Sequence, residues 1–163
     1  MATKPLFKIE LEKFEDAALE IQEGYLARKG RKGLAPFDTA ESFFKREAYS
    51  LLYQVEPARL HRIVTHILTR NSRIPRKGAY KENRFHWGLL AIDPDGVCLD
   101  EGGRKVFRHA RELHFARRNG VPATYLIGFL HQIGGVRRIP RSLSEVKKRH
   151  PSLSMEDRMG GGS

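Results

Sequence analysis

The stretch EGGRKVFRHARELHFARRNGVPATYLIGFLHQIG, residues 101–134, decides the fold that we expect of this chain. Its first half repeats with the period of a helix and carries two stripes. The apolar stripe consists of Val106, Ala110 and Leu113. The basic stripe consists of Arg104, Arg108, Arg111 and Arg118, with Phe115 between the last two. The spacing therefore predicts a helix over 104–118 that buries one face and offers the other to an anionic partner.

The second half of this stretch predicts a turn and another helix. Gly120 breaks the first helix, and Pro122 suits the first position of the next one, where its missing N–H is not needed. The arrangement resembles the helix-turn-helix pattern, whose small, turn and apolar positions are occupied here by Ala116, Gly120, Val121, Leu126 and Phe129. The segment 125–130, YLIGFL, offers almost no polar side chains to base edges. A groove-reading helix and a core helix packed under the basic one therefore both remain open.

Charge points to a polyanionic partner. The 163 residues include 30 Lys and Arg against 19 Asp and Glu, a formal net charge of +11. Such an excess attracts nucleic acid at long range. Residues 1–27 are the exception, since their three Lys and six acidic residues give −3 and leave +14 on the remainder. We therefore expect the amino-terminal helix to lie outside the binding face.

A second basic stripe is expected on a helix that starts at Pro57. Its apolar face is formed by Leu60, Ile63, Val64, Ile67 and Leu68, and its other face by Arg59, Arg62, His66, Arg70 and Arg73. The following loop, 70–84, adds basic residues around Tyr80, a composition that suits a phosphate backbone. The predicted nucleic-acid contacts are Arg59, Arg62, Arg70, Arg73, Arg76, Lys77, Lys81, Arg84, Arg104, Arg108, Arg111, Phe115, Arg117 and Arg118.

The remaining patterns predict one strand, two helices and a hairpin. Residues 6–11 alternate apolar and charged side chains, which predicts a short strand, and helical spacing then runs from about Glu12 to Arg28. Asp38 and Glu41 form a capping box for a helix over 40–55. The segment 85–99, FHWGLLAIDPDGVCL, predicts a β-hairpin around an Asp-Pro-Asp-Gly turn.

These elements predict an α+β fold that is mostly helical. We expect four to five amphipathic helices around one core, with a central β-hairpin and a basic C-terminal extension. Residues 1–136 would form a single globular domain. Residues 137–163 would form the extension, with a short helix over 143–149 and a flexible Gly-rich tail.

Few residues suggest chemistry. Asp93, Asp95, Asp100 and Glu101 could hold a divalent metal, but Asp-Pro-Asp-Gly is a common turn sequence because Asp side chains bond to their own backbone. The pairs His61/His66 and His109/His114 are five residues apart, so their side chains diverge on a helix. We expect no metal and no cofactor. The histidines that could act on RNA as a general acid or base are His86, His109, His114 and His131.

The chain lacks the usual signals for membranes and disulfides. No apolar stretch approaches the roughly 18 residues needed to span a bilayer, and the start lacks the apolar core of a signal peptide. The single cysteine, Cys98, allows no internal disulfide and lies in an apolar run, so we expect it in the core. We expect an intracellular, cytoplasmic protein without membrane association.

The sequence therefore favours a non-catalytic nucleic-acid-binding protein, an accessory subunit of a nucleoprotein complex. Its contacts would be mainly to the backbone of RNA or DNA, and RNA or single strands fit at least as well as duplex DNA. Three alternatives stay open: a small nuclease, a helix-turn-helix DNA-binding regulator, and a basic adaptor for an acidic protein partner. The acidic first helix and the segment 125–130 are the surfaces that could meet other protein subunits.

Overall fold

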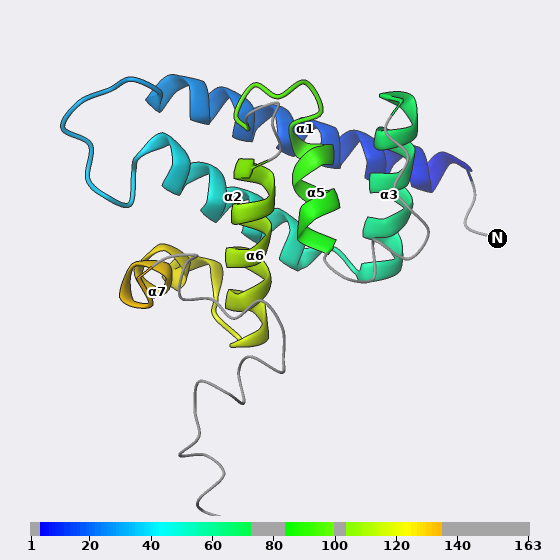
Figure 1. The fold of residues 1–163 in the computed structure, drawn as a ribbon. Helices are drawn as coiled ribbons and strands as arrows, with labels where there is room; N and C mark the ends of the chain where they lie inside the picture. Colours follow the sequence, from blue (N-terminus) through cyan, green and yellow to red (C-terminus); the bar gives the residue numbers. More distant parts are fainter. Residues whose placement is uncertain (1–3, 73–83, 100–103, 135–163) are drawn as a thin grey trace, which may run out of the picture.

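The structure of the protein is a computed structural model that describes residues 4–72, 84–99 and 104–134 (Figure 1). These ranges contain helices and turns, and no strand occurs in them. The helices are α1 (Lys4–Arg28), α2 (Ala40–Gln54), α3 (Pro57–Arg70), α5 (Arg84–Ile92), α6 (Arg104–Arg118), the 3-10 helix η1 (Ala123–Tyr125) and α7 (Leu126–Gln132).

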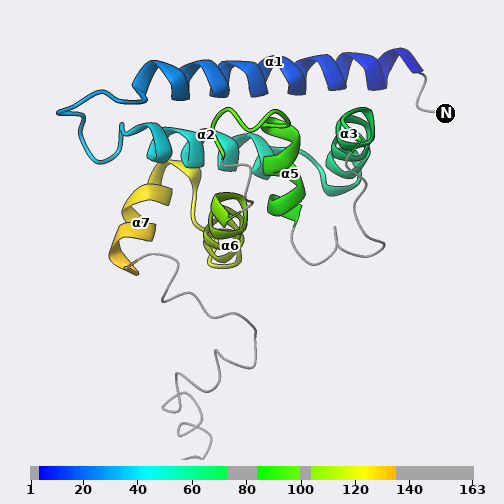
Figure 2. The ribbon, with the colours of Figure 1, turned by 45° about the horizontal axis from the view of Figure 1, so that its top comes forward.

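Helix α2 lies at the centre of the arrangement. Helices α1 and α2 run antiparallel, and Figure 2 shows α1 on one side of α2 and α6 and α7 on the other. Helix α5 packs against α1, α2, α3 and α6, so it separates α3 from α6. Helix α2 also contacts η1 and α7. The basic helix α6 is therefore held on the side of α2 that faces away from α1.

The amphipathic helices bury the faces that their spacing predicts. Helix α2 contributes Phe44, Ala48, Tyr49 and Leu52 to the core, all at most 1% exposed. The predicted apolar face of α3 is also buried, at Leu60, Ile63, Val64, Ile67 and Leu68. Buried side chains from α1 through α7 belong to one hydrophobic cluster. The predicted helices over 40–55, from Pro57 and over 104–118 are confirmed within a residue.

Two glycines allow helices to approach closely. A Cβ atom built on Gly24 of α1 would lie 2.3 Å from Phe43 Cε1 of α2, and one on Gly88 of α5 would lie 2.6 Å from Leu52 Cδ2. Both distances are far below ordinary contact, so no side chain fits there without a shift. At these two positions the backbone of α1 and that of α5 thus pack directly against side chains of α2.

The predicted strand over 6–11 is wrong, because these residues form the first turns of α1. Their alternation is real, but the helical spacing of Leu11, Phe14, Ala18 and Ile21 continues it and buries that face. Leu6 and Ile9 remain about half exposed on the other side. The long helical pattern of α1 therefore determines the structure of residues 6–11, although their short alternation is typical of a strand.

The predicted central β-hairpin over 85–99 is also wrong, and with it the α+β class. Residues 84–92 form α5, in which Phe85, Leu89 and Ile92 are fully buried. A short apolar run that is buried on several sides has no clear period, so sequence cannot distinguish a buried strand from a buried helix. No partner strand exists in the described residues, and the helical hydrogen bonds satisfy the backbone instead.

The Asp-Pro-Asp-Gly turn after α5 is organised by one carboxylate. Asp93 is buried, and its Oδ1 accepts the N–H of Val97 at 2.8 Å while its Oδ2 accepts those of Cys98 and Leu99 at 2.9 and 2.7 Å. The segment after the turn is thus held by a side chain rather than by strand pairing. Cys98 lies in the core, as predicted, and burial raises the pKa of its thiol to about 12.

The predicted N-cap of α2 is wrong, and the predicted C-terminal extension cannot be compared with the structure. The N-cap of α2 is Thr39 and not Asp38, since Thr39 Oγ1 accepts the N–H of Ser42 at 3.2 Å. The boundary at 136, the extension over 137–163 and its short helix lie outside the described residues and stay predictions. Among the described helices, none is long and apolar enough to cross a bilayer.

Replacing Gly88 by alanine is expected to destabilise the protein, because the new Cβ would collide with Leu52 in the core. Overpacking costs about 1–3 kcal/mol, more than the roughly 1 kcal/mol gained in helix propensity. Thermal unfolding followed by circular dichroism should give a lower Tm. The matched control is Gly128→Ala in α7, where, among the described residues, no atom outside the helix's own backbone lies within 4 Å of the new Cβ. That variant should keep or raise the Tm, and equal behaviour of the two variants would contradict the close packing.

Replacing Asp93 by asparagine is expected to destabilise the turn after α5. The amide NH₂ cannot accept hydrogen bonds, so at least one buried N–H loses its partner, at a cost of about 1–3 kcal/mol. Urea unfolding measures the difference. Asp95→Asn, an exposed change two residues later, is the control and should leave the midpoint unchanged. A wild-type midpoint for the Asp93 variant would show that the carboxylate is dispensable.

Candidate nucleic-acid interface

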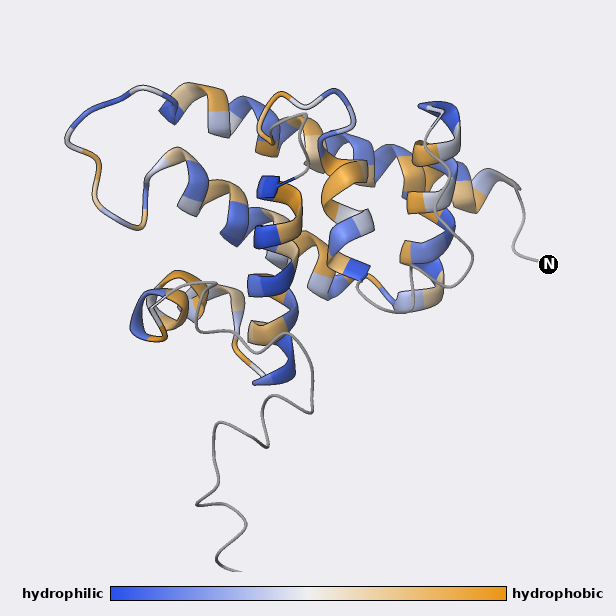
Figure 3. Ribbon diagram, viewed as in Figure 1, coloured by the Kyte–Doolittle hydropathy of each residue, from blue (hydrophilic) through white to orange (hydrophobic). Residues whose placement is uncertain are grey.

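Helix α6 presents its basic stripe outward. Val106, Ala110 and Leu113 are buried, as predicted, while Arg104, Arg108 and Arg118 are exposed on the other side. Figure 3 shows hydrophilic bands recurring along the α6 ribbon. The predicted division of this helix into an apolar face and a cationic face is confirmed.

Two ion pairs with α2 fix the rotation of α6. Lys45 Nζ lies 2.8 Å from Glu112 Oε2, and both side chains are largely buried. Lys105 Nζ lies 3.3 Å from Glu41 Oε1 near the start of both helices. Buried charges need a partner, so turning α6 about its axis would leave Lys45 or Glu112 uncompensated. The arginine stripe is therefore held away from α2.

Three arginines of this stripe have no acidic partner. The guanidinium groups of Arg104, Arg108 and Arg118 make no hydrogen bond or ion pair with any residue that the structure describes. Arg111 is partly buried on the same face. Arg117 differs, because its guanidinium lies 5.1 Å from the centre of the Tyr53 ring and takes part in packing against α2. The stripe thus offers at least three unpaired positive charges.

Three arginines on the basic side of α3 contact α1, although their side chains stay exposed. Arg59 Nε lies 3.1 Å from Glu10 Oε1, and Arg70 forms an ion pair with Glu15. The guanidinium of Arg62 lies 5.0 Å from the centre of the Phe7 ring, also on α1. Helix α5 contacts both α3 and α6, so among the described residues the two stripes lie on helices that another helix separates (Figure 1).

The remaining predicted contacts fall into two groups. Arg73, Arg76, Lys77 and Lys81 lie outside the described residues. Arg84 begins α5, where its Nη2 donates to the Leu52 carbonyl at 3.0 Å and its guanidinium lies 5.3 Å from the Phe85 ring centre. Arg84 therefore joins α5 to the end of α2.

The sequence pattern singled out Phe115 as the aromatic side chain on the basic face of α6, but the exposed one is Phe107. Phe115, the predicted one, stacks on Phe129 of α7 with ring centres 5.9 Å apart and so helps to pack α6 on α7. Phe107 is 59% exposed between Arg104 and Arg108. Its spacing of three residues from Arg104 places it on the basic face and could have identified it. The exposed face of α6 thus combines arginines with one largely exposed aromatic ring, which meets His86 of α5 edge-on with ring centres 6.4 Å apart.

The turn after α6 follows the helix-turn-helix pattern in part. Gly120 has a positive φ of 65°, and Ala116, Val121 and Leu126 are buried. The second helix starts later than predicted, since Pro122 precedes η1 and α7 begins at Leu126. Helix α7 has only seven residues, and its exposed polar side chains are His131 and Gln132, both in its last turn. It therefore offers little for reading base edges.

Two tyrosines of α2, Tyr49 and Tyr53, differ in environment. Tyr49 is fully buried, and its hydroxyl donates to the Val121 carbonyl at 2.5 Å. Burial and the neighbouring Tyr53 raise the pKa of Tyr49 to about 12, although Arg117 opposes the shift. Tyr53 is 44% exposed beside Arg117. Tyr49 is therefore a core residue that fixes the turn.

His109, a candidate general acid or base, is a buried residue of the interface between α6 and α2. Its ring is 3% exposed beside Phe44, and its Nδ1 has no hydrogen-bond partner among the described residues. Burial, with positive charges on Lys45, Arg108 and Lys105, lowers the pKa of His109 to about 3. Within the described ranges, no three His, Cys, Asp or Glu side chains are grouped to hold a metal ion.

Comparison of the chain with protein-family models, with curated proteins and with solved structures finds no match.

The low pKa of His109 should make the fold sensitive to acid. Below the ordinary histidine pKa of 6.5, the unfolded chain binds a proton that the folded protein does not bind until about pH 3. The free energy of unfolding should therefore decrease as the pH is lowered from 6.5 to about 3, by at most about 1.4 kcal/mol per pH unit. In His109→Leu this contribution is absent, so urea unfolding at pH 7 and 4.5 should differ less than in the wild type. His131→Leu, an exposed change, should keep the wild-type difference.

Proposed function

We propose that the protein binds nucleic acid through the exposed face of α6, as a non-catalytic accessory subunit of a nucleoprotein complex. One observation carries the proposal: Arg104, Arg108 and Arg118 are exposed along one helix face with no acidic partner in the described residues. Unpaired arginines on a rigid helix attract phosphates and release counterions when they bind.

The dimensions of this face suit a phosphate backbone. From Arg104 to Arg118 the helix rises by ~21 Å, at 1.5 Å per residue. One strand of a duplex carries a phosphate every 3.4 Å, so this length corresponds to roughly six phosphates. A small anion such as a single phosphate would contact a much shorter part of the helix. The length of the stripe therefore supports a polymer as the ligand.

The acidic residues of α1 support the choice of α6 over α3. Glu10 and Glu15 neutralise Arg59 and Arg70, so these two arginines attract phosphates less than unpaired arginines do. Helix α6 lies on the other side of α2 (Figure 2). Phe107 favours nucleic acid over an acidic protein as the partner, because an exposed ring between arginines can stack on a base.

The test compares two triple variants with the same loss of charge. Arg104→Gln, Arg108→Gln and Arg118→Gln are combined in the α6 variant, and Arg59→Gln, Arg62→Gln and Arg70→Gln in the α3 variant. Binding of labelled duplex DNA, single-stranded DNA and RNA is measured by fluorescence anisotropy across a salt series. The α6 variant should lose roughly tenfold or more in affinity, and its salt slope for duplex should fall by about 0.9 per lost contact.

The α3 variant should bind like the wild type, apart from any loss of stability measured separately by urea unfolding. Equal weakening of both variants would show that net charge, and not the α6 face, determines binding. No binding of any of the three polymers by the wild type would remove the proposal and leave the acidic protein partner as the better explanation of the charge.

A further inference from the structure

An apolar groove lies beside the carboxyl end of α6. It has a volume of about 580 Å³, and its lining comes from the loop before α2, from α2, and from the turn, η1 and α7. Two aromatic side chains of the groove are largely exposed: Phe37 at 55% and Tyr125 at 68%. Exposed aromatic rings lining a hollow are unusual for a surface that meets only water.

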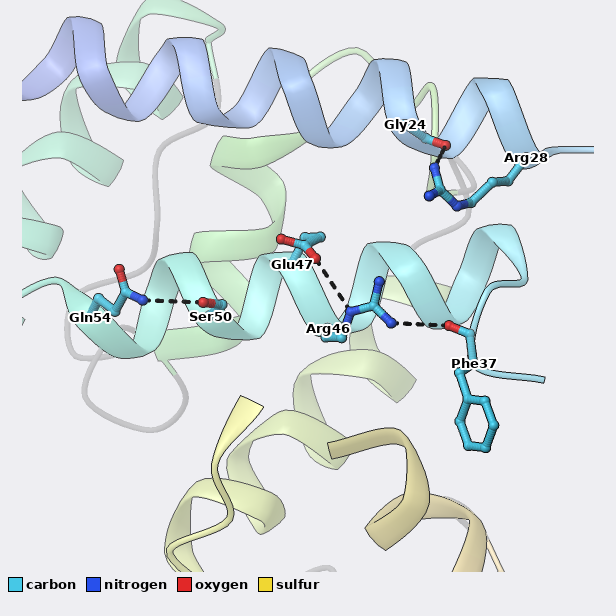
Figure 4. Close-up of polar contacts among 7 residues, drawn as sticks. All are labelled: Gly24, Arg28, Phe37, Arg46, Glu47, Ser50 and Gln54. Carbon is cyan, nitrogen blue, oxygen red and sulfur yellow. Dashed lines mark hydrogen bonds and ion pairs between the residues drawn. The ribbon is translucent and has the colours of Figure 1, made fainter. Parts of the chain in front are cut away.

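The loop that carries Phe37 is anchored while its ring stays accessible. Arg46 Nη1 donates to the Phe37 carbonyl at 3.2 Å, and Arg46 Nε lies 3.3 Å from Glu47 Oε1 (Figure 4). Figure 4 shows the Phe37 ring pointing away from α1, on the side of α2 where α6 and α7 lie. The ring is thus presented to the groove by a held backbone.

The groove continues directly from the basic face of α6. Arg118, the last residue of that face, is followed in the chain by Asn119 and Gly120, which line the groove. Phe129 of α7 also lines it and stacks on Phe115 of α6. A strand whose phosphates lie along α6 would therefore reach the groove at its end.

The lining combines what an unpaired base needs. Phe37 and Tyr125 supply aromatic faces, and the Thr124 hydroxyl and Gln132 amide supply hydrogen-bonding groups. Arg46 also lines the groove, but its guanidinium is already paired with Glu47 and bonded to the Phe37 carbonyl. What favours a phosphate-bearing ligand over an apolar peptide is the basic face of α6, at whose end the groove lies. The bases of an intact duplex are stacked inside and cannot enter such a groove.

We propose that this groove binds unstacked bases of a single-stranded nucleic acid whose phosphates lie along α6. The inference rests on the proposed function and makes it more specific, since it names single-stranded RNA or DNA as the ligand. Tyr125 and Phe37 are the stacking residues.

The experiment uses two oligonucleotides of about 15 nucleotides, the length that one single-strand-binding module covers at most. One is oligothymidine, and the other has the same phosphates but abasic sugars at every position. Fluorescence anisotropy with the full chain should give at least about fivefold tighter binding of oligothymidine, the effect of stacking one base. Tyr125→Ala and Phe37→Ala should each reduce that ratio, and their binding of the abasic strand should not change.

The controls separate stacking from side effects. Tyr125→Trp should keep the preference for oligothymidine, because stacking needs an aromatic ring. Leu19→Ala, on the outer side of α1 and 53% exposed in the wild type, should behave like the wild type.

The outcomes also separate this inference from the proposed function. Equal binding of both strands by the wild type, or a Tyr125→Ala variant that keeps the preference, would overturn the inference while backbone binding at α6 stands. No binding of either strand would overturn both. If Tyr125→Ala instead changes the molar mass in light scattering and leaves both affinities unchanged, the groove is a self-association surface and the inference fails.

Discussion

The hydroxyl of Tyr49 is the contact on which the arrangement of the helices depends. It donates to the Val121 carbonyl from within the core, while the Tyr49 ring stacks on Phe85 at 5.9 Å. A buried hydroxyl and a buried carbonyl each need a partner, so this bond stabilises one position of the turn relative to α2 and α5. The phenol is protonated at neutral pH even at its ordinary pKa of 10.0, and burial raises that pKa further, so the donor is present there. The position of this turn, residues 119–122, determines where α6 ends and where the groove begins.

Two similar basic stripes have different surroundings because of charges far away in the sequence. Arg59 and Arg70 meet carboxylates that lie 49 and 55 residues earlier in the chain, whereas the exposed arginines of α6 meet none in the described residues. Periodicity shows that a helix has a cationic face, but it cannot show what lies opposite that face. The sequence therefore predicted both stripes equally well, and only the packing of α1 on α3 distinguishes them.

The parts of the fold that could be predicted are the helices with long amphipathic repeats, such as α3 and α6, since burying one face requires that spacing. The strand and the hairpin could not, because short apolar runs such as 85–92 fit either period when they are buried on several sides. The exposed aromatic ring of α6 could not be predicted either, because periodicity does not show which ring a neighbouring helix covers. Phe115 and Phe107 both lie towards the basic side of α6, and only the position of Phe129 decides which ring is covered.

The separation of α1 from α6 gives the molecule an electric dipole in addition to its net charge. The acidic residues of α1 lie on one side of α2 and the unpaired arginines of α6 on the other (Figure 2). In the field of a polyanion such a dipole experiences a torque that turns α6 forward before contact. For the proposed binding to nucleic acid, a larger fraction of encounters would then begin in the productive orientation, and association would be faster than the net charge alone gives, most of all at low ionic strength.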